Sequence, residues 1–193
     1  MGAPQLAKLK LAVLVLASGR GERFKASGGT THKLDALIHI GQGLPSITVL
    51  QATLDKACST GLAVHVERAS HTGMGETIAA AVAATRDFDG WLMLPADMPM
   101  VSPEVILTVA AGLQDTPIAV PVFKGKRGHP VGFSRDCLAD LLALSGDEGA
   151  RSLFQKFEVK KINVDDLPLA AGCLMDIDTV QDLENMQNSG IFS

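Results

Sequence analysis

The most constraining feature of this sequence is an unbroken aliphatic run near its start, Leu11–Leu16 (LAVLVL). Such a run is typical of a strand buried on both faces, as in the interior of a parallel sheet. Further short aliphatic runs follow, and segments with helical spacing lie between them. Strands that alternate with helices predict an α/β sandwich around a mostly parallel sheet. In such folds, ligands bind beyond the carboxyl ends of the strands.

Length and composition indicate one folded unit. The chain has 193 residues, of which 47% are hydrophobic and 20% are charged. A chain of this size and composition can bury a full core without disulfide or metal staples, so we expect a single domain over residues 1–193. With seven Phe, one Trp and no Tyr, the core must be mainly aliphatic.

Charge and cysteine usage argue against several classes of function. The formal net charge of −4 provides no overall attraction for nucleic acid or anionic membrane, so we expect neither as a partner. The three cysteines, Cys58, Cys137 and Cys173, are odd in number and far apart, which favours reduced, buried thiols in a cytoplasm over a disulfide framework or zinc site. Residues 1–10 do not resemble a signal peptide, and no apolar stretch reaches the roughly 20 residues of a membrane span.

The apolar spacing and the turn residues predict where the elements lie. Expected strands are 11–16, 62–66, 91–94, 118–122, 131–133 and 159–164. Expected helices are 45–59, 74–86, one that opens with Ser102 as N-cap and Pro103 at its first position, 136–144, 150–156 and 179–186. Residues 17–33 show no apolar periodicity and are expected to form a long mobile loop.

This first loop is rich in glycine, serine and basic residues. Glycine allows close approach to phosphate, and successive backbone N–H groups can form an anion-binding nest. The loop is not a P-loop, and the dinucleotide pattern GxGxxG fails at Phe24. An ordinary solvated basic loop is the alternative interpretation. The positive charge comes from Arg20, Arg23, Lys25 and Lys33.

Two aspartates are candidate metal ligands. Asp97 directly follows a predicted buried strand and sits between Pro95 and Pro99. A carboxylate in such a stiff turn suits Mg²⁺, which proteins bind through one or two carboxylates plus phosphate oxygens. Asp178, at the entry to the last predicted helix, is a candidate second carboxylate. The alternatives are an ordinary turn aspartate at 97 and a helix N-cap at 178.

Three glycine-containing segments are further candidates. Residues 73–75 (GMG) begin a predicted helix, and a helix N-terminus can receive an anion or a base edge. Residues 128–130 (GHP) form a rigid turn with an imidazole, and residues 146–151 (GDEGAR) form an acidic turn before a helix. Each also has an ordinary interpretation as helix entry, loop histidine or capping turn. No role is predicted for His32, His39, His65 and His71, which show no metal spacing.

Taken together and in order, these segments resemble the MobA-like nucleotidyltransferase family, and within it the molybdenum cofactor cytidylyltransferases. The resemblance extends from about residue 11 to residue 183. Residues 16–24 (LASGRGERF) look like the family's LAAGxSxRMG signature. The other matching segments are 33–34 (KL), 73–75 (GMG), 95–99 (PADMP), 128–131 (GHPV), 146–151 (GDEGAR) and 176–179 (DIDT), the last three being typical of the cytidylyltransferase branch.

The resemblance implies a Rossmann-like nucleotidyltransferase fold, a three-layer sandwich. It also implies a Mg²⁺-dependent transfer from CTP to a phosphate-bearing acceptor, molybdopterin in this branch, with release of pyrophosphate. The catalytic residues that it implies are Arg23, Lys33 and Asp97, of which Arg23 and Lys33 would neutralise the triphosphate. Asp97 and Asp178 would hold Mg²⁺. The nucleotide would be held by Leu16, Ala17, Ser18, Gly19, Arg20, Lys33, Gly73, Gly75, Pro95 and Asp97, and the acceptor by His129 and Arg151.

The chain departs from the family's pattern in three places. Ser18 stands where Ala accompanies cytosine use and Gly accompanies guanine use. Phe24 replaces Met, and an insertion at 28–31 (GGTT) precedes Lys33. A strand–helix unit is missing between residues 66 and 73, so the sheet is expected to lack a strand.

Three alternatives stay open. One is a GTP-using transferase acting on the same cofactor, which the GHP and GDxGAR segments disfavour. Another is a transferase acting on a sugar or alditol phosphate. The third is a non-catalytic nucleotide- or cofactor-binding protein that delivers the cofactor to a molybdoenzyme or chaperone partner. Retention of Lys33, Asp97 and Asp178 argues against the third, because binding alone does not need two metal carboxylates.

Overall fold

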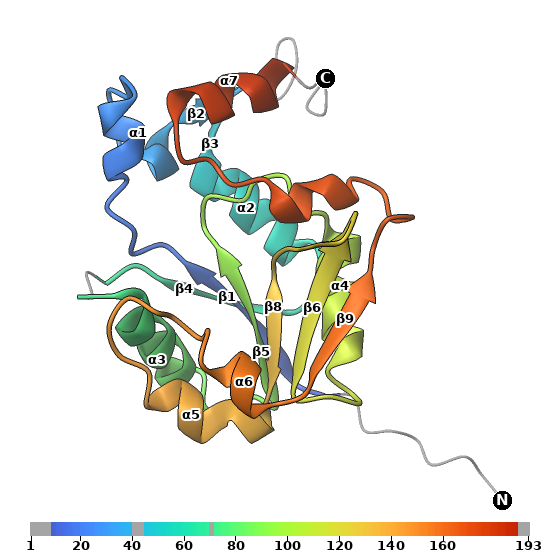
Figure 1. Ribbon diagram of the computed structural model, residues 1–193. Coiled ribbons are helices and arrows are strands. Elements are labelled where there is room, and N and C mark those ends of the chain that lie inside the picture. The colour runs from blue at the N-terminus through green and yellow to red at the C-terminus, as the bar shows by residue number, and fades with distance from the viewer. Residues whose placement is uncertain (1–8, 40–44, 70–71, 189–193) are drawn as a thin grey trace, which may run out of the picture.

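A seven-stranded sheet organises the described part of this computed structural model, residues 9–39, 45–69 and 72–188 (Figure 1). Its strands are β1 (Leu11–Leu16), β4 (Ala63–Glu67), β5 (Gly90–Pro95), β6 (Ile118–Phe123), β7 (Lys126–Arg127), β8 (Val131–Ser134) and β9 (Val159–Asn163). They follow the order β4-β1-β5-β8-β6-β7, and β9 also pairs with β6. A separate antiparallel pair joins β2 (Leu37–Ile38) to β3 (Ile47–Thr48).

The sheet is mixed but mostly parallel, as the sequence predicts. β1 is parallel to β4 and β5, and β6 is parallel to β9. Strand β8 runs antiparallel between β5 and β6, and β7 is antiparallel to β6. The carboxyl ends of β1 and β5 therefore lie at the same edge of the sheet, where the candidate residues were expected.

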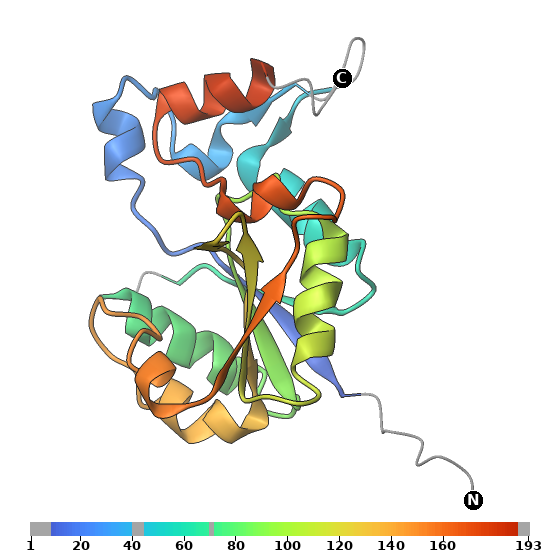
Figure 2. The same ribbon diagram turned by 45° about the vertical axis from the view of Figure 1, so that its right-hand side comes forward.

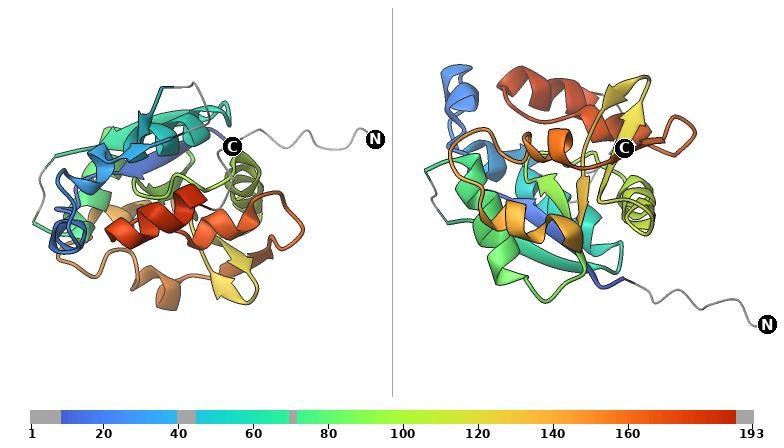
Figure 3. Two further views of the ribbon diagram at one scale, coloured as in Figure 1. Left: turned by 90° about the horizontal axis from the view of Figure 1, so that it is seen from above. Right: turned by 60° about the horizontal axis from the view of Figure 1, so that its bottom comes forward.

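Helices cover both faces of the sheet. Figure 2 shows α3, α5 and α6 on one face and α2 and α4 on the other. Helices α1 and α7 lie beyond the carboxyl end of β5, at the top of Figure 1 and toward the viewer in the left view of Figure 3. The α-helices are α1 (Glu22–Ala26), α2 (Val49–Cys58), α3 (Met74–Ala84), α4 (Pro103–Gly112), α5 (Leu138–Leu142), α6 (Leu153–Lys156) and α7 (Val180–Asn188). Short 3₁₀ turns are η1 (Lys33–Asp35), η2 (Arg135–Cys137) and η3 (Ala170–Leu174).

The alternation of side chains along β1 explains why its aliphatic run is unbroken. Val13 and Val15 belong to the hydrophobic cluster that contains the buried residues of α2 and α4. Ala12 and Leu14 point the other way, into the cluster that contains residues of α3 and α5. Burial of a Val or Leu side chain stabilises a fold by about 1.5–3 kcal/mol, so both faces of the strand must be apolar. The predicted three-layer α/β sandwich is confirmed.

Local signals place some helix ends correctly and others not. The Ser102 hydroxyl accepts a hydrogen bond from the Val105 N–H at 3.3 Å, so the predicted N-cap is confirmed. The helix expected from residue 45 instead begins at Val49. Residues 47–48 pair with 37–38, and the Thr48 hydroxyl caps the helix by accepting from the Gln51 N–H.

The segment 17–33 is not the unstructured loop that its polar sequence predicts, because it contains α1. Phe24 is 3% exposed and anchors this short helix to the core. Gly29 packs on Phe24: a Cβ at position 29 would lie 2.3 Å from the phenyl ring, and the Gly29 N–H donates to the Phe24 carbonyl. The absence of a side chain at Gly29 therefore leaves room for the Phe24 ring.

Among the described residues, α3 is the element that follows β4, and the two are separated by residues 68–73. β4 is the last strand at this end of the sheet's pairing order. That the sheet lacks a strand of the family's pattern stays a prediction.

All three cysteines are free, but they are not all buried as expected. Cys137 and Cys173 are buried, and burial raises the pKa of the Cys137 thiol to about 12. Cys58, the last residue of α2, is exposed, so the prediction for that thiol is wrong. None of the described helices is long and apolar enough to cross a membrane.

Candidate functional site

Backbone hydrogen bonds gather three distant segments at the carboxyl ends of β1 and β5. The Ala96 N–H donates to the Leu16 carbonyl at 3.1 Å, which fixes the turn that carries Asp97. The Ile177 N–H donates to the Asp97 carbonyl at 3.0 Å, so the segment before α7 is tied to the same turn. The turn and the C-terminal segment thus bring Asp97 and Asp178 to one place.

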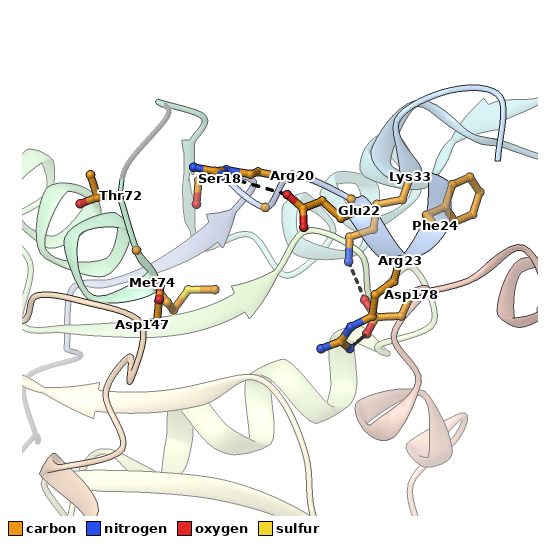
Figure 4. Close-up of a pocket in the computed structure, with 13 residues that line it drawn as sticks. Ser18, Arg20, Glu22, Arg23, Phe24, Lys33, Thr72, Met74, Asp147 and Asp178 are labelled. Carbon is orange, nitrogen blue, oxygen red and sulfur yellow. Dashed lines mark hydrogen bonds and ion pairs between the residues drawn. The ribbon is translucent and has the colours of Figure 1, made fainter. Parts of the chain in front are cut away.

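Lys33 joins these two carboxylates. Its Nζ lies 2.5 Å from Asp97 Oδ2 and 2.8 Å from Asp178 Oδ1. The Lys33 and Asp97 side chains are only 13% and 14% exposed, and Asp178 is 30% exposed. Arg23 approaches from solvent and contacts Asp178 Oδ2 at 2.6 Å, as Figure 4 shows. Four residues that the sequence proposed from four separate segments therefore form one cluster.

The charges in this cluster stabilise one another. Burial alone would lower the pKa of Lys33, but the attraction of Asp97 and the hydrogen bonds to both carboxylates raise it above its ordinary value. The hydrogen bond from Lys33 lowers the pKa of Asp178, and Arg23 adds to that effect. Lys33 is therefore an ammonium and Asp178 a carboxylate at neutral pH.

Asp178 is not the N-cap of the last helix, although its position in sequence allows that interpretation. Thr179 fills this role in a capping box with Asp182. The Asp182 N–H donates to Thr179 Oγ1 at 3.2 Å, and the Thr179 N–H donates to Asp182 Oδ2 at 2.7 Å. The carboxylate of Asp178 is thereby left available for Lys33 and Arg23.

The two carboxylates fit a divalent cation. Asp97 Oδ1 is buried and has no hydrogen-bond partner among the described residues, and such an orphaned carboxylate oxygen suits a metal ligand. Mg²⁺ typically takes one or two carboxylates and completes its shell with water and phosphate oxygens. A richer cluster of three or more His, Cys, Asp or Glu is absent from the described residues. The donor set thus suits a cation shared with a phosphate ligand.

A cavity of about 470 Å³ opens beside this cluster. Its wall includes Ser18, whose hydroxyl lies 2.7 Å from Thr77 Oγ1 in α3. Of the residues predicted to bind the nucleotide, five do not line it: Leu16, Ala17, Gly75, Pro95 and Asp97. The lining is Ser18, Gly19, Arg20, Gly21, Glu22, Arg23, Phe24, Lys33, Thr72, Gly73, Met74, Asp147 and Asp178.

The two glycines at the start of α3 serve close packing. A Cβ at Gly75 would lie 2.6 Å from the Ser145 backbone, and one at Gly73 would lie 2.4 Å from the Gly146 carbonyl oxygen. The Gly75 N–H donates to that same carbonyl at 2.7 Å. Gly73 lines the cavity and Gly75 does not. The GMG segment therefore docks residues 145–147 at the cavity rim.

A second, more apolar cavity of about 690 Å³ contains the other predicted group of residues. His129 and Arg151 both line it, together with Leu16 and Pro95. Burial lowers the pKa of His129, against smaller opposing effects of a Met93 backbone hydrogen bond and of Asp97 and Asp176, so the imidazole is neutral at neutral pH. Met74 lines both cavities, which therefore adjoin.

Sequence reasoning missed two residues of the site. Arg127, in β7, lines the second cavity with its guanidinium 5.5 Å from the Phe154 ring centroid. His32 connects the ends of the first loop, since its Nδ1 accepts from the Leu34 N–H at 3.3 Å and its Nε2 donates to the Gly19 carbonyl at 2.8 Å. The position of His32 directly before Lys33 is the sequence signal that could have identified it.

Comparison with known proteins identifies a matching domain family and a curated relative. The MobA-like NTP transferase domain matches residues 13–162. Purine catabolism protein PucB of Bacillus subtilis is 30% identical over 128 residues, which are 65% of this chain and 62% of PucB. The chain thus matches less than two thirds of this curated relative's length.

Solved structures with the same fold cover nearly the whole chain. Rv0371c from Mycobacterium tuberculosis superposes with a TM-score of 0.72 at 25% identity, covering 93% of this chain and 99% of that one. Its manganese complex gives a TM-score of 0.68 at 24% identity over the same shares. Molybdopterin-guanine dinucleotide biosynthesis protein A from Archaeoglobus fulgidus gives 0.63 at 16% identity, covering 92% and 97%. Because the family's domain matches residues 13–162, well over half of the chain, and the fold agrees, this chain belongs to the MobA-like NTP transferase domain family.

Proposed function

We propose that this protein transfers CMP from CTP to a phosphate-bearing acceptor, molybdopterin, in a Mg²⁺-dependent reaction that releases pyrophosphate. The observation that carries the proposal is the Lys33 ammonium held between Asp97 and Asp178 at the rim of the first cavity. A triphosphate needs this combination of positive charge and cation-binding carboxylates, because phosphoryl chemistry depends on positioning and charge neutralisation rather than on a protein nucleophile.

The two cavities divide the substrates between them. CTP occupies the cavity lined by the first loop, with its phosphates toward Arg23 and Lys33. The acceptor occupies the apolar cavity lined by His129 and Arg151, whose guanidinium supplies charge for an acidic group. A flat pterin suits the apolar walls of this cavity.

The reaction follows from this arrangement. An oxygen of the acceptor phosphate bonds to the α-phosphorus of CTP, and the bond from that phosphorus to the bridging β-phosphate oxygen breaks. Pyrophosphate leaves with the electron pair of the broken bond. Asp97 and Asp178 would hold Mg²⁺, which supplies charge neutralisation on the phosphates when bound. Lys33 and Arg23 neutralise the remaining phosphate charge. They do so by electrostatic attraction, and no proton is transferred.

The direct test is pyrophosphate release with Mg²⁺ and molybdopterin, comparing CTP, GTP, ATP and UTP. We expect release with CTP and at least about tenfold slower release with the others, the size of discrimination that one good polar contact provides. Parallel reactions with Mn²⁺ test the metal, since the structure of Rv0371c with manganese makes Mn²⁺ a reasonable substitute. Release with GTP alone would favour the guanylyl alternative, which the name of the Archaeoglobus relative supports.

A non-catalytic delivery protein would behave differently. It would bind nucleotide or cofactor and be stabilised by them, yet release no pyrophosphate with any of the four nucleotides. If release occurs only with a sugar or alditol phosphate in place of molybdopterin, the acceptor assignment is wrong while the nucleotidyl transfer stands.

Replacing His32 with alanine is expected to raise the KM for CTP by about tenfold while changing kcat less. The ring makes two hydrogen bonds, to Gly19 and to Leu34, and each such bond contributes about 1 kcal/mol to holding the loop in its binding conformation. Steady-state kinetics at saturating acceptor measures the effect. His39→Ala is the matched control, since His39 is exposed and lines neither cavity. An unchanged KM in the His32 variant would contradict the positioning role.

A further inference from the structure

The first cavity has two chemically different ends. Figure 4 shows Arg23, Lys33 and Asp178 at one end and Thr72, Met74 and Asp147 at the other, with Ser18 and Arg20 between them. The first end carries the positive charge that phosphates require. Among the described residues that line the second end, none has a basic side chain. If a nucleotide binds here, its nucleoside therefore lies toward Met74 and Asp147.

Asp147 is held in place from two sides. The preceding residue, Gly146, donates its N–H to Glu76 Oε1 at 2.9 Å and accepts from the Gly75 N–H. The missing side chain of Gly73 leaves room for the carboxylate: a Cβ there would lie 2.9 Å from Asp147 Oδ1. No described residue donates a hydrogen bond to this carboxylate or forms an ion pair with it. A carboxylate without a partner among the described residues is thus positioned at the nucleoside end.

We propose that Asp147 is a specificity-determining residue that accepts a hydrogen bond from an amino group on the nucleotide base. The inference rests on the proposed nucleotidyl transfer and deepens it. A carboxylate at neutral pH can only accept hydrogen bonds, so it favours cytosine, which presents an amino group, over uracil, which presents a carbonyl oxygen at the same position.

Met74 supplies the second part of this subsite. Its side chain is 41% exposed and lines the cavity next to Asp147. A thioether packs favourably against aromatic rings, so it suits the face of a base while the carboxylate contacts the edge. A ribose offers hydroxyl donors but no aromatic face, which favours the base over the sugar as the group that Asp147 recognises.

The test is equilibrium binding of CTP, UTP and 2′-deoxy-CTP to the intact protein by calorimetry, without acceptor. We expect wild type to prefer CTP over UTP by about tenfold or more, and Asp147→Asn to lose most of this preference, because an amide can donate to the uracil carbonyl. Glu148→Gln is the matched control. It removes the same charge from the neighbouring exposed residue, which lines neither cavity, and should keep the preference.

The other outcomes separate this inference from the proposed function. An unchanged ratio of CTP to UTP affinity in Asp147→Asn, or an equal loss of affinity for all three nucleotides, would overturn the base-reading role while leaving the transferase in place. Loss of the preference for CTP over 2′-deoxy-CTP alone would assign the carboxylate to the ribose and also overturn it. Failure of wild type to bind any of the nucleotides would overturn the proposed function itself.

Discussion

Asp97→Asn is expected to lower kcat/KM for nucleotidyl transfer by about 100-fold or more, because a bound metal contributes several kcal/mol to the stabilisation of transition-state charge. The amide keeps the size of the side chain and can still accept from Lys33. It removes the negative charge, however, and replaces one carboxylate oxygen with an amide nitrogen. If the amide oxygen stays with Lys33, the position lost to a cation is the buried Oδ1, which has no partner among the described residues. The loss should therefore fall on metal binding more than on the fold.

Two measurements on the same variant separate these effects. Mn²⁺ titration followed by electron paramagnetic resonance should show weakened binding, whereas the thermal midpoint should stay close to that of wild type. The matched control is Asp87→Asn, at an exposed turn just before the other end of β5. If Asp97→Asn kept activity within a few-fold of wild type, Asp97 would be an ordinary turn residue and the metal assignment would be wrong.

Signals confined to a few neighbouring residues made much of the fold predictable. The bounds of β1 follow from its aliphatic run alone, because burial on both faces leaves no other arrangement for those residues. The start of α4 follows from Ser102 and Pro103, which provide a cap and a preset backbone angle. Features of this kind need no knowledge of distant contacts.

Long-range pairing was less predictable. The antiparallel direction of β8 follows from partners on β5 and β6 and not from its own residues. Helix α1 forms in a polar segment because Phe24 packs against Gly29 and the core, and periodicity over five residues is too short to detect. Likewise, the start of α2 depends on the pairing of residues 47–48 with 37–38.

The candidate site likewise combines residues that the sequence can propose with long-range contacts that it cannot. Lys33, Asp97 and Asp178 could be proposed from the resemblance, but nothing local indicates that one ammonium would contact carboxylates 64 and 145 residues away. The cap of α7 was ambiguous in sequence, because Asp178 and Thr179 are both good N-cap residues. In the structure Thr179 is the N-cap, because its N–H donates to the Asp182 carboxylate and its hydroxyl accepts from the Asp182 N–H, which completes a capping box.

Lys33→Ala is expected to lower kcat/KM for CTP by about 100-fold, comparable to the removal of one preorganised donor from a transition-state site. The Lys33 ammonium is only 13% exposed and contacts both carboxylates, so it is fixed before the triphosphate arrives. Arg23 cannot replace it, because its side chain is 80% exposed and, in the part of the chain that the structure describes, forms an ion pair with Asp178 alone. Steady-state kinetics over a range of CTP concentrations measures the loss.

The same variant should respond more strongly to divalent cations when no nucleotide is present. In wild type, Lys33 neutralises the two carboxylates, and its positive charge opposes a cation at that place. Without it, Asp97 and Asp178 face each other with Arg23 as their remaining countercharge in the cluster, and Mg²⁺ or Mn²⁺ should raise the thermal midpoint more than it does in wild type. Lys25→Ala is the matched control, since Lys25 is exposed in α1 and does not line the cavity. Normal kinetics in Lys33→Ala combined with a loss in Lys25→Ala would assign phosphate neutralisation to Lys25, and the cluster at Lys33 would then be a structural ion pair.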